Sequence, residues 1–547
     1  MDKSRAREST NAIGRIYITM RHLMHRGFYK PMGVSGKTLR EALLELRPEI
    51  YGDIATNKLE LGGLFYVLDR LPEGIEKCTY INLTSDEGYK YSKLKVIIPP
   101  KRRRKCYALD EDQMNIEITR GRSDVYDVLT HLTFLCIESH KIANFILRED
   151  ETETIREWKK LEEYLQKDEI TAEELELALI YTSSIIGKSF KEVKAVYKQA
   201  SSKKNPHRFL HLIYWMGRRA LDEKQNEQKR VISFSNSLRE RIGHHIYGDR
   251  WANTIKYKLK ESELFDRPIH IISANMHSVM NYLYAKKVSS VKNEYKSFEQ
   301  LSLTKNDALR NEVLQYALLN GLQSIKDDSG TNIDVQIIDL SKVDISKSFL
   351  KEKSNSNAVL IVMDYAFGEQ AYECMDELLK PFKADGSQDK LNIQSISIMG
   401  KAGILEGGKG DIMLPSAHVF EGTADNYPFT NELHASDFSN EDLLIQSGPM
   451  ITVLGTSLQN KEVLNYFKSS TWGMIGLEME GAHYQKAIQS ASRIRKSISE
   501  NVKVRYAYYA SDNPLKTGST LASGGLGLNG VKPTYIITKK ILQQILS

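Results

Sequence analysis

The chain has 547 residues, of which 41% are hydrophobic and 27% are charged. This length exceeds one ordinary domain, and the composition is that of a soluble globular protein. No apolar run is long enough to span a membrane, the polar N-terminus has no signal-peptide core, and the four widely spaced cysteines form no CxxC pair. These features argue against a membrane protein, a disulfide framework or a zinc ribbon, and we expect a cytoplasmic protein.

The net charge of +6 is small for this length and does not imply nucleic-acid binding. The densest basic run is KRRRK at 101–105, which is either a phosphate contact or a solvated loop. We favour the loop because no aromatic residues are interleaved with the basic ones. His207 and His211 are four residues apart, but spacing offers no third ligand, so we expect no metal site.

The first half of the chain is predicted to be mainly helical, because apolar residues recur at helical spacing. Thr171, with Glu174 three residues later, predicts a capping box at a helix start. The predicted helices cover residues 123–147, 171–200 and 205–242, and a small strand-like patch covers 77–100. We therefore expect a helical N-terminal region over 1–265, whose role the sequence does not indicate.

The second half alternates short runs rich in Ile and Val with helical stretches. The predicted strands cover residues 268–274, 332–340, 357–365, 393–400, 410–420, 449–456 and 503–511. Such alternation is typical of an α/β domain with a largely parallel sheet that helices cover on both faces. The sequence thus predicts an α/β domain over 266–547.

Four motifs fall at the ends of predicted strands or the starts of helices. They are IMGKAGIL (398–405), KGDIMLPSAHVFEG (409–422), GLEMEGAHY (476–484) and YYASDNPL (508–515). Ligands of open α/β sheets bind at the carboxyl ends of the strands. The order of the four motifs is therefore more informative than any one of them.

This ordered set resembles the nucleoside phosphorylase / nucleosidase superfamily over residues 266–547. The family pattern is a G-[ST]-[AC]-G turn, then G-D, then [DE]-M-E-[AG]-A, then S-D after a strand. The matching positions here are Gly400-Lys401-Ala402-Gly403, Gly410-Asp411, Glu478-Met479-Glu480-Gly481-Ala482 and Ser511-Asp512. The resemblance implies a mixed sheet flanked by helices and a catalytic site for a purine nucleoside or nucleotide.

The resemblance assigns a role to each matching side chain. Asp512 would act as the general acid at the purine N7, and Ser511 would support its loop. Glu480 would bind the ribose hydroxyls and stabilise positive charge on the sugar, with Met479 as an apolar contact. Glu478 is expected to be a supporting residue.

Two of the departures from the family pattern concern residues of the expected site. Lys401 stands where the family has a small polar residue, so it either binds a substrate phosphate or blocks the usual phosphate site. The turn after the first strand contains Asn275 and His277 in place of the family's glutamates or phosphate-binding arginine. We expect His277 to position water or to bind phosphate.

The preferred prediction is hydrolysis of a nucleotide such as AMP, because SDNPL (511–515) resembles the corresponding stretch of AMP nucleosidases. One alternative is a purine nucleoside phosphorylase, with phosphate as co-substrate. Another is a sensor that binds a nucleotide without cleaving it and has a helical effector half. In each case we expect a homo-oligomer without a further cofactor.

Overall fold

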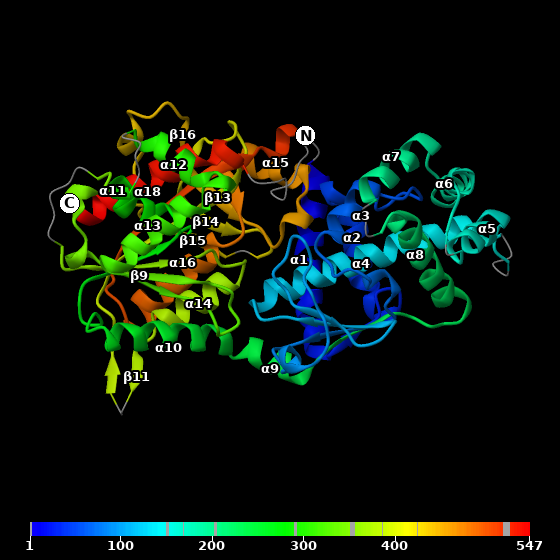
Figure 1. Ribbon diagram of the computed structural model, residues 1–547, viewed down its shortest axis with the longest axis horizontal. Coiled ribbons are helices and arrows are strands. Elements are labelled where there is room, and N and C mark those ends of the chain that lie inside the picture. Colours follow the sequence, from blue (N-terminus) through cyan, green and yellow to red (C-terminus); the bar gives the residue numbers. More distant parts are fainter. Residues whose placement is uncertain are drawn as a thin grey trace. The chain divides into compact units, whose positions relative to one another are not determined.

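The computed structural model describes residues 3–148, 153–167, 169–201, 205–288, 293–350, 356–384, 387–423, 425–517 and 526–547. These residues form two compact units (Figure 1). The C-terminal unit contains Arg120–Ser123 and His244–Ser547, and the N-terminal unit contains the other described residues. A four-residue segment from the first half of the chain therefore belongs to the C-terminal unit.

The N-terminal unit combines helices with a sheet whose described strands follow the order β1-β6-β2-β5-β4-β3. Its helices are α1 (Lys3–Arg26), α2 (Lys37–Leu46), α3 (Leu61–Leu68), α4 (Gly121–Ile146, of which residues 121–123 are assigned to the C-terminal unit), α5 (Arg156–Leu165), α6 (Ala172–Ile186), α7 (Phe190–Ala200), α8 (Arg208–Gln225) and α9 (Asn236–Gly243). Its strands are β1 (Phe28–Tyr29), β2 (Tyr80–Thr84), β3 (Val96–Ile97), β4 (Cys106–Ala108), β5 (Gln113–Glu117) and β6 (Val231–Phe234). The sheet is larger than the strand-like patch predicted over 77–100.

The predicted helix over 205–242 is wrong at its centre. Helix α8 ends at Gln225, and residues 231–234 form strand β6. This strand pairs with β1 and β2, whose residues lie about 150 to 200 positions earlier in the chain. Four residues are too few to show a strand period, so these long-range pairs decide the conformation.

The capping box at Thr171 is confirmed. The Glu174 amide donates to Thr171 Oγ1 over 3.2 Å, and the Thr171 amide donates to a Glu174 carboxylate oxygen over 3.0 Å. The stretch 171–200 contains two helices, because Gly187 (φ 64°) ends α6 in the left-handed conformation.

The basic run at 101–105 is partly used inside the N-terminal unit. Arg102 pairs with Asp127 at 2.6 Å, and buried Arg104 pairs with Asp124 at 2.9 Å. These two guanidinium groups are therefore held by carboxylates of the same unit, and the run is not simply a solvated loop.

The sheet of the C-terminal unit has ten strands among the described residues. They are β7 (Ile269–Ser273), β8 (Leu322–Ile325), β9 (Val335–Asp339), β10 (Val359–Met363), β13 (Ile393–Ile404), β14 (Ile412–Phe420), β15 (Asn426–Pro428), β16 (Ile445–Thr452), β17 (Gly476–Glu478) and β18 (Lys503–Asp512). Strands β7, β10, β13 and β18 pair in parallel, whereas β9 and β17 run antiparallel to their neighbours β10 and β13. The sheet is therefore mixed.

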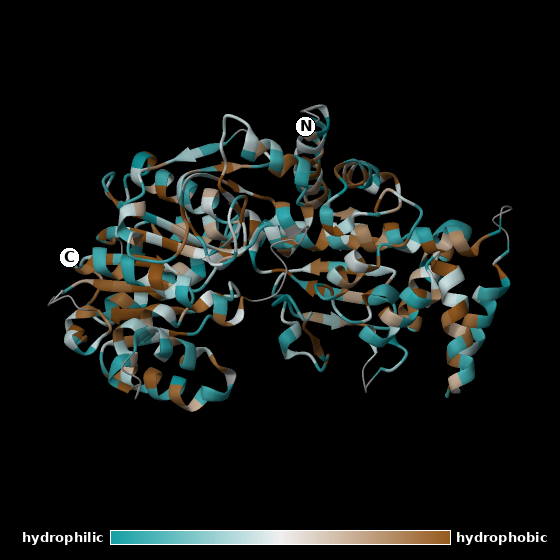
Figure 2. Cartoon of the chain, turned by 90° about the horizontal axis from the view of Figure 1, so that it is seen from above, coloured by the Kyte–Doolittle hydropathy of each residue, from teal (hydrophilic) through white to brown (hydrophobic). Residues whose placement is uncertain are grey.

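Helices cover both faces of this sheet. Residues of α10 (Ile246–Glu261), α14 (Gln370–Leu378) and α16 (Gly481–Gln489) share one buried cluster with the strands, and residues of α11 (Ser278–Val288), α13 (Asp307–Leu319) and α18 (Val531–Leu546) share another. Every residue of β9 and β10 is buried, which explains the uninterrupted apolar sequence of β10, whereas β9 also buries the polar Gln336 and Asp339. In Figure 2 the strands are correspondingly rich in hydrophobic colour.

The remaining elements of the C-terminal unit are α12 (Glu294–Ser302), α15 (Lys461–Ser469), α17 (Pro514–Thr517) and a hairpin of β11 (Phe382–Ala384) and β12 (Ser387–Asp389). Among the described residues, every helix is too short or too polar to cross a membrane. The four cysteines are buried and free of disulfide bonds.

Candidate active site

The site is built where several strands of the C-terminal unit end. Ser273 of β7 pairs with Met363 of β10 and with Ile398 of β13, so β7 and β10 end level with each other at one edge of the sheet, while β13 continues beyond them to Ile404. On β13, Gly403 is paired with Leu477 of β17 on one side and with Asp512 of β18 on the other. The turn after β17 and the end of β18 are therefore two strand spacings apart, about 10 Å.

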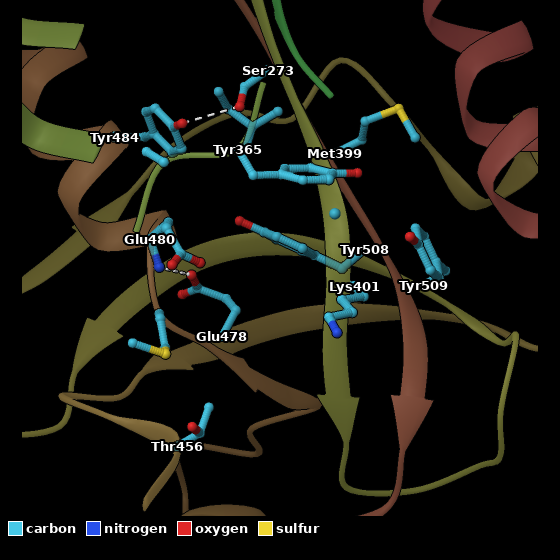
Figure 3. Close-up of a pocket in the computed structure, with 14 residues that line it drawn as sticks. Ser273, Tyr365, Met399, Lys401, Thr456, Glu478, Glu480, Tyr484, Tyr508 and Tyr509 are labelled. Atoms are coloured by element: carbon cyan, nitrogen blue, oxygen red, sulfur yellow. Dashed lines mark hydrogen bonds between the residues drawn. The ribbon is translucent and has the colours of Figure 1, made fainter. Parts of the chain in front are cut away.

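A cavity of about 240 Å³ opens at this edge (Figure 3). Predicted site residues from two motifs line it together, although more than 70 positions separate them in sequence. Its lining consists of Ser273, Tyr365, Ala366, Ile398, Met399, Gly400, Lys401, Thr456, Glu478, Met479, Glu480, Tyr484, Tyr508 and Tyr509. Gly400, Lys401 and Glu478–Glu480 are among the residues predicted from the sequence, whereas none of the tyrosines is.

Glu478 is held tightly by its own turn. The backbone amides of Glu480 and Gly481 donate to its Oε2, the former over 2.5 Å, and the Thr452 hydroxyl donates to its Oε1. His418 Nδ1 lies 3.4 Å from Oε1. Burial alone would raise the pKa of Glu478, but the contacts with His418, Thr452 and Gly481 outweigh it, and the pKa is lowered. Glu478 is thus an ionised carboxylate that fixes the start of α16.

Glu480 has the opposite electrostatic environment. Burial, together with the negative charge of Glu478, raises its pKa to about 8, although the Gly368 amide donates to its Oε1 over 2.8 Å. At neutral pH the free protein therefore holds Glu480 as a neutral carboxylic acid. Such a group can both donate and accept hydrogen bonds within the cavity.

The loop that supports Glu480 is itself fixed by the segment Arg120–Ser123 of the same unit. The Glu369 amide donates to Ser123 Oγ over 2.8 Å, and Arg122 Nη1 lies 2.7 Å from Glu369 Oε1. The Arg120 guanidinium lies 4.7 Å from the centre of the Phe367 ring, and its charge opposes the rise of the Glu480 pKa.

Sequence reasoning missed this segment, since nothing in RGRS (120–123) connects it with a glutamate 357 to 360 positions later. In the structure, the positive φ of Gly368 and its close packing against Ser123 show that this segment and the loop at Gly368 fit together. Gly368 has φ 56°, and a Cβ there would lie 2.4 Å from Ser123 Oγ.

Asp512 lies at the end of β18, next to a bulge. Ala402 pairs with Ala510 and Gly403 with Asp512, so Ser511 is the extra residue. The Ser511 hydroxyl lies within hydrogen-bond reach of Asp512 Oδ1 at 2.7 Å and of the Ala402 carbonyl at 3.2 Å. Asp512 Oδ2 is buried and has no hydrogen-bond partner among the described residues.

Burial raises the pKa of Asp512, although Ser511 and the positive charges of Lys401 and Lys409 oppose the rise. A raised pKa is what an acid needs at neutral pH. The carboxyl group lies outside the described linings of the cavities, close enough to Lys401 for the two charges to interact.

A second cavity, of about 640 Å³, adjoins the first and shares Tyr365, Lys401 and Tyr509 with it. Asn275 and His277 line it, as do Arg310 and the turn at 526–530. Asn275 Oδ1 accepts from the Ser278 amide over 2.8 Å and so caps α11, and burial lowers the pKa of His277. His277 is therefore a neutral imidazole at pH 7.

The predicted site residues thus divide into three groups. Gly400, Lys401, Glu478, Met479 and Glu480 line the first cavity; Asn275, His277 and Lys401 line the second; and Ala402, Gly403, Ser511 and Asp512 form the adjoining strand ends. Lys401 connects all three groups, because it lines both cavities and acts on the pKa of Asp512.

The model of a protein family described as a family of unknown function (DUF6909) matches residues 37–298 and 290–547. No curated protein matches the chain. Among solved structures, native futalosine hydrolase of Helicobacter pylori matches with 13% identity and a TM-score of 0.31, over 51% of this chain and 98% of that chain. The 5′-methylthioadenosine/S-adenosyl homocysteine nucleosidase of Campylobacter jejuni matches with 11% identity and a TM-score of 0.31, over the same shares. At these identities and TM-scores, function must be argued from the residues of the site.

Proposed function

The chain belongs to a family of unknown function (DUF6909), and we propose that it cleaves the N-glycosidic bond of a purine nucleoside or nucleotide by hydrolysis. The observation that carries the proposal is a pair of carboxyl groups: Asp512 pairs with Gly403 on one side, and Glu480 lies three residues after Leu477, which pairs with Gly403 on the other side. Burial raises the pKa of both. The sequence motifs that contain them, which resemble those of the nucleoside phosphorylase / nucleosidase superfamily, support the same roles.

Asp512 suits the acid role at the base. Its Oδ1 is engaged by Ser511, and its buried Oδ2, which has no hydrogen-bond partner among the described residues, would have to be reached by the base from the adjoining cavity. A proton held there can pass to, or be shared with, the purine N7 as the bond to the sugar breaks, so that the base leaves as a neutral molecule. The raised pKa keeps this proton available.

Glu480 suits the sugar role. It lies in the cavity beside the apolar side chain of Met479, and its Oε1 is oriented by the Gly368 amide. Bound to the 2′- and 3′-hydroxyls as a carboxylate, it would stabilise the positive charge that develops on the ribose. Because that charge favours the ionised form, we expect the pKa of Glu480 to fall when substrate binds.

Phosphorolysis is the second candidate. It is favoured by the adjoining cavity, where the ammonium group of Lys401 suits a phosphate; Arg310 also lines this cavity, but its guanidinium donates to the Leu301 and Leu303 carbonyls. That phosphate is either a co-substrate or part of a nucleotide substrate. Base release requires added phosphate if the phosphate is a co-substrate, and does not require it if the phosphate belongs to the nucleotide.

The test is chromatographic measurement of base release from adenosine, inosine and AMP, with and without inorganic phosphate. Release without phosphate supports hydrolysis, and release that depends on phosphate supports phosphorolysis. Binding without release would instead support a nucleotide sensor.

The acid role is tested with Asp512→Asn, which keeps an oxygen for the Ser511 hydroxyl but cannot deliver a proton. We expect kcat to fall by a factor of about 10² to 10⁴. A variant that releases base as fast as the parent protein would contradict the mechanism.

A further inference from the structure

Tyr508 is a cavity residue that the proposed chemistry does not yet use. It lies on β18, four residues before Asp512, and its side chain is 3% exposed. Figure 3 shows its ring in the cavity, with the hydroxyl end on the side of Glu478 and Glu480. The charges of both glutamates contribute to raising the pKa of Tyr508, which agrees with this placement.

The hydroxyl group of Tyr508 has no hydrogen-bond partner among the described residues. Burial, the largest cause, also raises its pKa well above the usual value, so it is a neutral phenol with one O–H to donate. By contrast, two other hydroxyls of the cavity, Ser273 and Tyr484, bond to each other at 3.0 Å. An unpaired buried hydroxyl costs free energy in the absence of a ligand.

Tyr506 shows that burial alone does not mark a ligand site. It is two residues earlier on the same strand, is 0% exposed, and its hydroxyl also lacks a partner among the described residues. Tyr506 does not line the cavity, whereas Tyr508 does. The two residues therefore differ in access to a ligand rather than in hydrogen bonding within the protein.

We propose that Tyr508 determines specificity by donating a hydrogen bond to a hydroxyl of the ribose that Glu480 binds. The substrate class is then ribonucleosides or ribonucleotides rather than their deoxy analogues. A deoxy substrate leaves the buried phenol unpaired, and sites built to bond a hydroxyl discriminate strongly against analogues that lack it. This inference rests on the proposed function, because it takes the sugar to lie at Glu480.

The experiment compares the parent protein, Tyr508→Phe and the matched control Tyr506→Phe. Base release is measured with adenosine, 2′-deoxyadenosine and 3′-deoxyadenosine, and the ratios of kcat/KM are compared. We expect Tyr508→Phe to lose at least tenfold of the preference for adenosine over one deoxy analogue. We expect Tyr506→Phe to keep the parent ratios, and an unchanged ratio in Tyr508→Phe would overturn the inference.

Two further measurements separate this inference from the proposed function. If no protein releases base, the proposed cleavage fails, and the same three ligands are compared by calorimetric binding; a binding preference that Tyr508→Phe loses still supports the role of the hydroxyl. The unfolding midpoint of Tyr508→Phe should equal or exceed that of the parent, since no bond within the protein is lost. A lower midpoint, as after loss of a paired hydroxyl, would overturn the inference.

Discussion

The buried acid Glu480 should make the protein less stable as pH rises, and Glu480→Gln should remove that effect. The folded state holds the proton up to about pH 8, whereas a glutamate in the unfolded chain has a pKa of 4.5. Between these values the unfolded chain binds fewer protons than the folded chain, so the free energy of unfolding falls as pH rises. Above about pH 8 both states are ionised and the loss stops growing.

The magnitude follows from the width of this window. At pH 7 the folded state holds a proton about 2.5 pH units above the unfolded pKa, which costs about 3 kcal/mol at about 1.4 kcal/mol per unit. Glutamine has no proton to lose and can still accept from the Gly368 amide. Glu480→Gln should therefore be about as stable as the parent at pH 4.5 and about 3 kcal/mol more stable at pH 7.

The assay is denaturant unfolding at several pH values from 4.5 to 8.5, with base release measured in parallel. Glu421→Gln is the matched control, because Glu421 is 4% exposed, burial raises its pKa to about 8, and it does not line the first cavity. The difference in the free energy of unfolding between each variant and the parent protein should increase with pH, but only Glu480→Gln should lose base release. A Glu480→Gln offset that is constant with pH would refute the raised pKa, and full activity would refute the sugar role.

Two substitutions test the surroundings of these carboxyl groups. Gly368→Ala should cost about 1–3 kcal/mol of stability and lower kcat/KM, because φ is 56° and the new Cβ would lie 2.4 Å from Ser123 Oγ. Gly408→Ala is the control, because its new Cβ would have no neighbour within 4 Å. Equal effects of the two substitutions on thermal unfolding and turnover would contradict the packing argument. Lys401→Met should raise the pKa of Asp512 further, since the lysine charge lowers it, so the basic limb of the pH profile of kcat/KM should move to higher pH. A shift to lower pH would exclude Asp512 as the acid, and Lys401→Arg should leave the limb in place.

Local sequence predicted β7, β9, β10, β13, β14, β16 and β18 of the large sheet, but it missed β8, β15 and β17, which have four residues or fewer. Strands such as β10 (Val359–Met363) are covered on both faces, so they read as continuous apolar runs between turns. The same reading failed at β6 (Val231–Phe234), which is short and defined by partners far away in the chain. The strand pairs that stabilise β6 join distant parts of the chain, so the neighbouring residues give no sequence signal of a strand.

The site was predictable to the extent that its residues sit in motifs. Asp512 ends β18 and Glu480 immediately precedes α16, and both the end of that strand and the start of that helix could be located from sequence. The contribution of Arg120–Ser123 depends on contacts with a loop more than 240 positions later, so no local sequence pattern could predict it. Tyr508 is intermediate: alternation along β18 places Tyr506 and Tyr508 on one face, but it cannot say which of the two meets a cavity.

The strongest reason to regard this edge as a binding site is that it contains groups that lower the stability of the free protein. A protonated glutamate at 480, a buried oxygen of Asp512 and the phenol of Tyr508, the last two without partners among the described residues, each cost free energy, and the three residues lie on β18 and in the turn after β17, the two strands that pair with Gly403 of β13. Glu421 and Tyr506 carry similar costs away from the cavity lining, so such groups are not diagnostic one at a time. Under the proposed function, one ligand with a base at one end and a sugar diol at the other would satisfy all three groups. Stabilisation by such a ligand should therefore be larger in the parent protein than in variants that lack any one of the three groups.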